Sequence, residues 1–464
     1  MIETPVDHKL PKGRVYWAPV DDVERMFDEL PTEISPRWAG ERLPKKDMWV
    51  ELGGPKHDYK SFYLIDKRDL KEIEHGRIEI IGPELNELPE GTSLPFGYYL
   101  IVGGERLTDE HVSYFERWAM DNHVKQEGIL WLNTRDMVWC RIHKRLKGRM
   151  DSFKWLPWAA MAMFLSQLPT IIDAIEAKMI IATPEIGGKE LIAEIIERQC
   201  RPVWEARDAR ALEIRDEEVD TFYGCTLCQS FAPNHCCVIT PDRTPFCGVL
   251  NWHNARACLD VDPMGYCFVI PKGECLDPDV GRYSGVEKAI YERSNRTIKR
   301  VYLYSTIKYP MTSCGCFEIL VFYIPEVDGL GIVNRTYKGK TPLGVPFSTL
   351  AGMCGGGVQY HGFCGACVLY LKSPKFAQGD GGWDRVVWIP KDLKMKIADA
   401  IPETHFHLIP TEEDAVEPDE LKEWLKKIGH PIVKKFWKDG EPQPIQLPGP
   451  GELWPEDKEE DESS

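Results

Sequence analysis

The chain lacks the segments that would direct it to a membrane. Met1 is followed by IETPVDHKLPKG, which has neither the basic start nor the apolar stretch of a secretory signal peptide. The most apolar run, residues 155–165 (WLPWAAMAMFL), contains Pro157 and is shorter than the ~20 residues that a membrane span needs. We therefore expect a cytoplasmic protein without a membrane span, in which this run forms a buried helix.

Positive charge is scarce. The 464 residues include 73 acidic and 57 basic side chains, for a net charge of -16. This balance disfavours nonspecific binding to nucleic acid or to anionic membranes. Residues 379–383 (GDGGW) are rich in glycine, but no GxGxxG or P-loop follows a strand there, so they are better read as a tight turn than as a phosphate-binding loop. No Ser-His-Asp or paired-carboxylate pattern indicates conventional acid–base catalysis.

The first half of the chain has almost no cysteine. Of fifteen cysteines, only Cys140 and Cys200 precede residue 220, and the other thirteen lie between residues 225 and 367. Without a secretory signal, so many cysteines indicate metal or thiolate chemistry rather than disulfides. We expect the chemistry in the second half.

The length exceeds that of one typical domain core, so the sequence predicts two domains of an α+β (mixed α/β) class. The predicted parts are an N-terminal extension at 1–35, an α/β domain at 36–218, a metal-cluster domain at 219–438 and a disordered acidic tail at 439–464. Periodicity predicts strands at 48–52, 77–81, 97–102, 301–305, 317–324 and 331–334, and one beginning at 180. It predicts helices at 21–30, after Thr108, over most of 152–178, and at 188–198, 391–400 and 420–428, the last with Asp419 as its N-cap.

Residues 224–247 (GCTLCQSFAPNHCCVITPDRTPFC) are rich in thiols. The spacing C-x2-C-x8-C-x9-C is compatible with a four-iron cluster. Cys236 and Cys237 are adjacent and would point opposite ways in extended chain, so the spacing alone leaves the third ligand open. Structural zinc is the alternative, but four cysteines within 23 residues without flanking histidine pairs favour iron and sulfur.

The tripeptide Cys314-Gly315-Cys316 places two thiols one residue apart. This separation is too short for an ordinary disulfide, and zinc ligands usually lie two to four residues apart. It suits a square-planar nickel ion held by both sulfurs and by the backbone nitrogens between them. A residue without a β-carbon between the thiols lets the two successive amides fold flat about the metal.

These motifs resemble the acetyl-CoA synthase subunits of archaeal acetyl-CoA decarbonylase/synthase complexes, also called CO-methylating acetyl-CoA synthases. The resemblance covers residues from about 36 to 437. The segments that carry it are YGCTLCQSFAP, VITPDRTPFCG, TSCGCFE, YIPEVDGLGIVNR, TPLGVPFS, SPKF and DGGWDRVVW. The CGC tripeptide combined with the upstream cysteine spacing is highly specific to this family.

The resemblance implies a [4Fe-4S] cluster bridged by one cysteine sulfur to a pair of nickel ions. The iron ligands would be Cys225, Cys228, Cys237 and Cys247. The family's spacing thus selects Cys237 over Cys236, and Cys228 would bridge to the proximal nickel. Cys314 and Cys316 would share their sulfurs between the two nickel ions.

The distal nickel would be completed by the backbone nitrogens of Gly315 and Cys316, and Phe231 would shape or gate the small pocket beside the proximal nickel. The implied activity is that of an acyltransferase, which forms or reversibly cleaves acetyl-CoA. Its methyl group would come from a corrinoid iron–sulfur protein and its CO from CO dehydrogenase subunits, with coenzyme A as the acceptor. Bacterial relatives carry a further N-terminal domain, so the length predicts the archaeal form inside a multi-subunit complex.

Two other functions fit parts of the pattern. An iron–sulfur electron-transfer subunit of a larger redox complex would need only the upstream cysteines, and a structural zinc scaffold would need fewer still. Neither gives Cys314 and Cys316 a role.

Residues 133–149 (NTRDMVWCRIHKRLKGR) are basic in an otherwise acidic chain. Candidate contacts for coenzyme A are Arg135, Trp139, Arg141, Lys144 and Arg145, with the tryptophan stacking on adenine and the cations meeting phosphates. The family is similar in placing a tryptophan and arginines of this domain near the coenzyme. A solvated charged face is the alternative.

The remaining thiols and histidines are predicted to be structural. Cys354, Cys364 and Cys367, with His361, follow an unspecific spacing, and buried thiols in a glycine-rich loop are expected there rather than a second metal site. The same prediction holds for Cys258, Cys267 and Cys275, and for His405 and His407.

Overall fold

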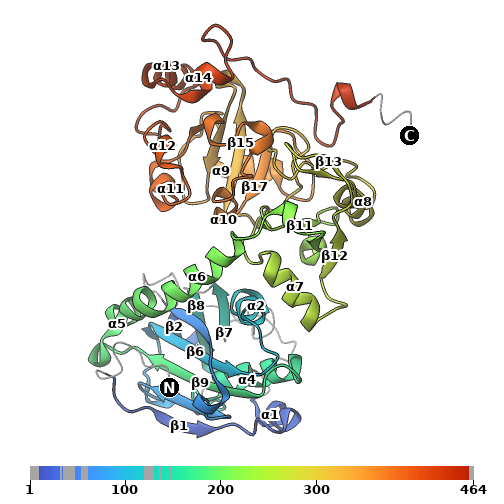
Figure 1. Cartoon of the computed structure of the whole chain (residues 1–464). Helices are drawn as coiled ribbons and strands as arrows, with labels where there is room; N and C mark the ends of the chain where they lie inside the picture. The colour runs from blue at the N-terminus through green and yellow to red at the C-terminus, as the bar shows by residue number, and fades with distance from the viewer. Residues whose placement is uncertain are drawn as a thin grey trace. The chain divides into compact units, whose positions relative to one another are not determined.

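The computed structural model describes residues 10–31, 34, 47–53, 61–119, 130–134, 137–146 and 148–458. The chain forms two compact units, Met1–Ala209 and Arg210–Ser464, each containing helices and strands (Figure 1). This confirms the predicted α+β class. The division precedes the predicted boundary at 218 because Asp216 already bonds to Asp242 of the second unit, with the backbone N–H of each residue donating to the carboxylate of the other at 2.9 Å.

The first unit contains two mixed sheets. The five-stranded sheet has the order β1-β4-β9-β6-β3, with bounds Arg14–Trp17, Arg77–Ile81, Ala174–Ile181, Phe96–Gly103 and Phe62–Lys67. The four-stranded sheet has the order β5-β2-β8-β7, with bounds Thr92–Leu94, Met48–Gly53, Met137–His143 and Leu130–Thr134. The strands predicted at 48–52, 77–81 and 97–102 are confirmed.

The described α-helices of this unit are α1 (Val23–Glu29), α2 (Asp109–Tyr114), α4 (Trp155–Gln167), α5 (Gly188–Ile195) and α6 (Arg201–Ala211), of which the last continues two residues into the second unit. The described part of the predicted extension at 1–35 belongs to the unit, since β1 pairs with β4 and the Trp158 indole donates to the Met26 carbonyl at 3.0 Å. No helix among the described residues is long and apolar enough to cross a membrane.

The helix predicted over 152–178 is only partly correct. It ends at Gln167, and the strand expected to begin at residue 180 is β9, which starts at Ala174. β9 carries Glu176 in its middle, which interrupts an apolar strand pattern. That carboxylate is buried because Arg77 of the neighbouring strand donates to it at 2.9 Å.

The second unit is built on a four-stranded sheet of order β17-β15-β16-β18, with bounds Phe363–Ala366, Ile319–Ile324, Gly329–Val333 and Val386–Trp388. All six residues of β15 (ILVFYI) are buried. Alternate residues of this strand enter two different core clusters, one with α9 (Phe347–Cys354), α13 (Pro418–Ile428) and α14 (Pro431–Lys435) and the other with α10 (Val368–Leu371) and α11 (Lys391–Lys396). A strand covered on both faces explains the unbroken apolar run.

Two smaller sheets complete the unit: β11-β10-β12 (Cys237–Ile239, Thr221–Cys225 and Cys267–Pro271) and β13-β14 (Cys275–Asp277 and Arg282–Tyr283). The helices are α7 (Trp252–Val261), α8 (Ser284–Arg293), α9 (Phe347–Cys354), α10 (Val368–Leu371), α11 (Lys391–Lys396), α12 (Glu403–Phe406), α13 (Pro418–Ile428) and α14 (Pro431–Lys435).

Two local predictions in this unit are wrong. Residues 301–305 form no strand, because their backbone bonds to loops, with Leu303 N donating to Gly281 O at 3.2 Å. The N-cap of α13 is Glu417 rather than Asp419, since Pro418 occupies the first helical position, where its missing N–H costs nothing.

The prediction of a disordered tail at 439–464 is also wrong as far as residue 458, and residues 459–464 lie outside the described part. Apolar side chains of the tail pack on the second core cluster, namely Ile445, Leu447, Leu453 and Trp454. The Tyr309 hydroxyl donates to the Asp457 carboxylate at 2.8 Å. The acidic, proline-rich composition of this segment gave no indication of these packing contacts.

Asp216 is fully buried and makes stability depend on pH. Its carboxylate accepts hydrogen bonds from the Thr240 hydroxyl, the Tyr304 hydroxyl and the Asp242 backbone N–H. Burial raises the pKa of Asp216 to about 6 despite these bonds. Since the folded state binds this proton more tightly than the unfolded chain, the contribution is complete below about pH 4 and is lost as pH rises through about 6.

We therefore expect Asp216→Asn to remove an increase in unfolding free energy that the wild type shows between pH 7 and pH 5, on the order of 1 kcal/mol. Urea unfolding of the metal-free chain at pH 7, 6 and 5 measures it. Parallel pH profiles for the two proteins would contradict the assignment.

Candidate metal centre

The upstream cysteines lie on and beside the sheet β11-β10-β12. Cys225, the last residue of β10, is paired in register with Cys237 of β11 and with Cys267 of β12. Directly opposed residues of antiparallel strands point to the same face, with Cβ atoms roughly 4.5–5.5 Å apart. The sheet therefore aligns three thiols in a row, two of which are predicted iron ligands. A hydrogen bond from Cys267 lowers the pKa of Cys225.

Cys228 lies in a 3₁₀ turn, Leu227–Ser230, immediately after β10. The turn is closed by the backbone N–H groups of Phe231 and Ala232, which donate to the Cys228 carbonyl at 3.2 and 3.0 Å. Phe231 follows the turn with 58% of its side chain exposed. Core packing therefore does not account for this phenylalanine.

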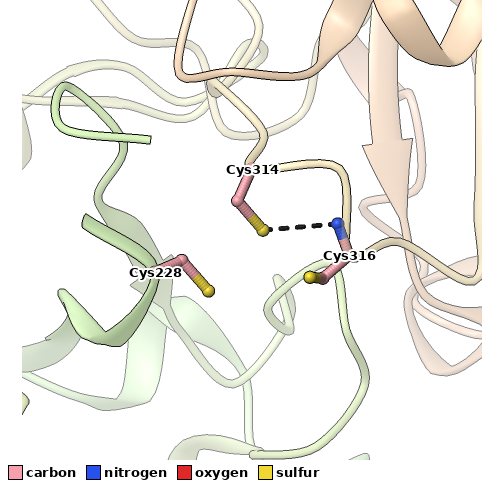
Figure 2. Close-up of side chains that lie close together, drawn as sticks. All are labelled: Cys228, Cys314 and Cys316. Carbon is pink, nitrogen blue, oxygen red and sulfur yellow. Dashed lines mark hydrogen bonds between the residues drawn. The ribbon is translucent and has the colours of Figure 1, made fainter. Parts of the chain in front are cut away.

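The CGC tripeptide forms a loop in which Gly315 adopts a φ of 104°, a region that residues with a β-carbon rarely occupy. Gly315 N donates to the Ser313 hydroxyl at 3.1 Å, and Cys316 N lies 3.3 Å from the Cys314 sulfur. The backbone nitrogen and the sulfur thus already lie on the same side of the loop, as Figure 2 shows.

Cys228 meets this loop. The sulfurs of Cys228, Cys314 and Cys316 all lie within 4.8 Å of one another, with the side chains pointing toward a common centre (Figure 2). Hydrogen bonds with the two loop thiols raise the pKa of Cys228 far above its usual value. Hydrogen bonds from Cys228 and Cys314 lower the pKa of Cys316 to about 3, so the group readily holds a thiolate.

Cys237 and Cys247 are close to the same group of thiols. Burial raises the pKa of both, and the nearby Cys225 and Cys314 raise each of them further. The Cys236 side chain takes no part in this group, since its thiol donates to the Cys237 carbonyl at 3.7 Å. All the predicted sulfur ligands thus belong to adjoining segments of the second unit.

Sequence reasoning missed the side chains and glycines that support this loop. Gly357 N donates to the Ser313 carbonyl at 2.8 Å, and a Cβ at Gly357 would lie 3.0 Å from the backbone nitrogen of His235. A Cβ at Gly355 would lie 3.8 Å from the Gly315 Cα. The triple glycine at 355–357 was the available signal, because three successive glycines allow close approach of other backbones.

Among the described residues, the three thiols above are the one group whose ligand atoms all lie within 4.8 Å of one another, and Cys354, Cys364 and Cys367 form no such group. Cys354, Cys364 and Cys367 are buried, as predicted. The His361 ring is occupied by structural hydrogen bonds, accepting from Tyr309 N at 3.2 Å and reaching the Glu452 carbonyl at 2.8 Å. His405 lies in α12 and pairs with Asp384 at 3.0 Å.

The candidate coenzyme contacts lie in the first unit, except that Arg135 is outside the described residues. Trp139 and Arg141 both lie on β8, where the Arg141 guanidinium stacks on the Trp139 ring at 4.0 Å and donates to Glu51 at 2.9 Å. Lys144 pairs with Glu90, and Arg145 is exposed. Arg141 is thus held by contacts within the protein, whereas Arg145 lies at the surface.

The donors present fit the metals that the motifs predict. Soft sulfurs from three cysteines converge, and the amide nitrogen of Cys316 lies 3.3 Å from one of them, the Cys314 sulfur. Such a mixed sulfur and nitrogen set suits planar nickel, while a cubane needs the thiolates of the neighbouring sheet. The fold and site together define an α+β protein with a thiolate-rich candidate metal centre.

Comparison with known families identifies the class further. Residues 204–436 match the family described as the C-terminal part of the ACS/CODH beta subunit, and residues 30–186 match CO dehydrogenase/acetyl-CoA synthase complex beta subunit. The chain belongs to this family of acetyl-CoA synthase β subunits, and the homology supports an enzyme of acetyl-CoA synthesis.

Similar curated proteins carry the name acetyl-CoA decarbonylase/synthase complex subunit beta. The one from Methanopyrus kandleri is 44% identical over 89% of this chain and 86% of its own length. Subunit beta 2 of Methanocaldococcus jannaschii is 44% identical over 90% and 87%. The protein from Methanothermobacter thermautotrophicus is 44% identical over 88% and 86%.

Proposed function

We propose that this chain is a CO-methylating acetyl-CoA synthase, an acyltransferase that forms or reversibly cleaves acetyl-CoA. Its substrates would be a corrinoid-bound methyl group, CO and coenzyme A. The observation that carries the proposal is the convergence of Cys228 with Cys314 and Cys316 within 4.8 Å. An electron-transfer subunit would need no such meeting of the upstream motif with the CGC loop.

Within this proposal, a [4Fe-4S] cluster is held by Cys225, Cys228, Cys237 and Cys247, and two nickel ions by Cys228, Cys314 and Cys316 with the backbone nitrogens of Gly315 and Cys316. When bound, the nickel pair would supply the place where the methyl and carbonyl carbons combine. The protein's part is to present soft sulfurs on a fixed loop and to keep one side open, since Cys316 is exposed.

Phe231 is assigned to the open side. Its backbone N–H donates to the Cys228 carbonyl, and the residue is 58% exposed instead of buried in the core. A rigid aromatic ring at this position would limit the pocket to small substrates. Exclusion of larger molecules is its proposed role.

Coenzyme A is assigned to the first unit through Trp139, Lys144 and Arg145, with Arg135 and Arg141 as further candidates. The exposed Arg145 is suited to phosphate, whereas the Arg141 guanidinium, stacked on Trp139, is suited to holding that ring in place. Proposed partners are the corrinoid iron–sulfur protein and CO dehydrogenase subunits, since the relatives are named as subunits of a complex.

The proposed location is the cytoplasm. None of the fifteen cysteines, all within the described residues, forms a disulfide, which is typical of a reducing compartment.

The test is metal analysis and turnover of the anaerobically purified chain. We expect about four iron and about two nickel ions per chain, and acetyl-CoA formation from a methylated corrinoid protein, CO and coenzyme A. Iron without nickel in nickel-replete protein would favour the electron-transfer subunit. Zinc alone would contradict both functions.

A further inference from the structure

His235 lies between the two segments that carry the candidate metal ligands. Its side chain is 1% exposed. The ring Nε2 lies 3.1 Å from the sulfur of Cys237, the first residue of β11. The ring Nδ1 lies 3.1 Å from the hydroxyl oxygen of Thr312, two residues before Cys314. One buried side chain therefore joins the cluster segment to the CGC loop.

The ring is held in place from several sides. His235 N donates to the Ala232 carbonyl at 2.9 Å, and the Phe246 ring lies 5.8 Å from the imidazole. Gly357 approaches so closely that a Cβ there would meet the His235 backbone at 3.0 Å. The orientation of the imidazole is thus set by packing as well as by its two polar partners.

The partners decide where the ring proton lies. A cysteine that ligates iron is a thiolate and cannot donate, so Nε2 must carry the proton and donate to the Cys237 sulfur. The other ring nitrogen faces a hydroxyl, which can donate to it, so a neutral imidazole with its single N–H on Nε2 satisfies both contacts. Nδ1 then accepts from the Thr312 hydroxyl, and this bond selects the tautomer.

We propose that His235 is a positioning residue of the iron–sulfur cluster: its Nε2–H holds the Cys237 thiolate, and Thr312 on the CGC loop holds the ring. The inference rests on the proposed function, because it requires Cys237 to ligate the cluster. A hydrogen bond to a ligand sulfur offsets its negative charge and favours the reduced cluster. Its loss shifts the reduction potential to more negative values.

The experiment compares variants of the full-length, metal-loaded chain by reductive titration followed by electron paramagnetic resonance. His235→Phe removes both ring nitrogens at similar volume, and we expect its cluster potential to be more negative than that of the wild type. His235→Gln can return one N–H, so a partial recovery is expected. His430→Phe is the matched control, because His430 is equally buried but contacts Val386 O and Ile432 N instead.

Variants of Thr312 provide a second test of the proposal in which His235 is retained. Thr312→Val removes the hydroxyl at constant shape and should shift the potential in the same direction by less, while Thr312→Ser should match the wild type. This test decides the matter even where His235→Phe fails to fold.

An unchanged potential in both His235→Phe and Thr312→Val, with iron still bound and acetyl-CoA still formed, would overturn this inference and leave the proposed function standing. A shift in His430→Phe as large as that in His235→Phe would also overturn it, since it would show a general effect of core damage. Wild-type chain without iron would overturn both.

Discussion

Replacing Cys314 and Cys316 together by serine should remove nickel and leave iron. The double variant takes away both loop sulfurs that lie within 4.8 Å of Cys228, whereas the thiols of the sheet β11-β10-β12 are untouched. We expect nickel to fall from about two ions per chain to near zero, with iron staying at about four. Acetyl-CoA formation should fall by roughly a thousandfold or more, because the metal proposed to assemble the product would be gone.

Cys275→Ser is the control, because Cys275 is exposed and lies outside the group of converging thiols. It should keep both metals. Metal analysis of anaerobically prepared protein and the synthesis assay measure the outcome. Nickel retained at wild-type level in the double serine variant would show that the CGC loop is not its site.

Gly315→Ala should weaken nickel binding through the backbone alone. At a φ of 104° an alanine is strained by about 1–2 kcal/mol, and relief of that strain rotates the peptide that brings Cys316 N to 3.3 Å from the Cys314 sulfur. All the sulfurs remain, so iron should be unaffected. We expect nickel affinity to fall roughly 10–100-fold, the range found when the groups that orient metal ligands are changed.

Gly344→Ala is a matched control for backbone strain. Gly344 has a φ of 74°, and, as at Gly315, a Cβ there would meet no atom within 4 Å. Both variants should lose similar stability on thermal unfolding, but only Gly315→Ala should lose nickel when titrated with a chelator. Equal nickel retention in the two would mean that the left-handed conformation of Gly315 plays no part in binding metal.

Much of the fold was predictable where local pattern and burial agree. The strand over 77–81 alternates as a pleated strand should, and the helix after Thr108 begins at a side chain that caps its backbone. The start of β9 was placed six residues too late because Glu176 and Lys178 are buried within it. Their cost is offset by partners on other strands, such as Arg77, which no local window contains.

The C-terminal tail is a different case, in which the composition predicts disorder but the structure shows packing. Proline and acidic residues predict disorder when a segment has too little apolar surface to fold alone. Residues 439–458 need not fold alone, because Trp454 and its apolar neighbours pack on a core that the rest of the unit has already built.

The sequence by itself determined the donor types, their spacing within each motif and the glycine at residue 315, because these depend on covalent neighbours. Only the tertiary structure decided that Cys228 meets the CGC loop, that Cys225 faces Cys237, and that His235 joins Cys237 to Thr312. These contacts join segments far apart in the chain or depend on strand pairing. They require the folded second unit, in which these segments pack against the core clusters on the two faces of β15.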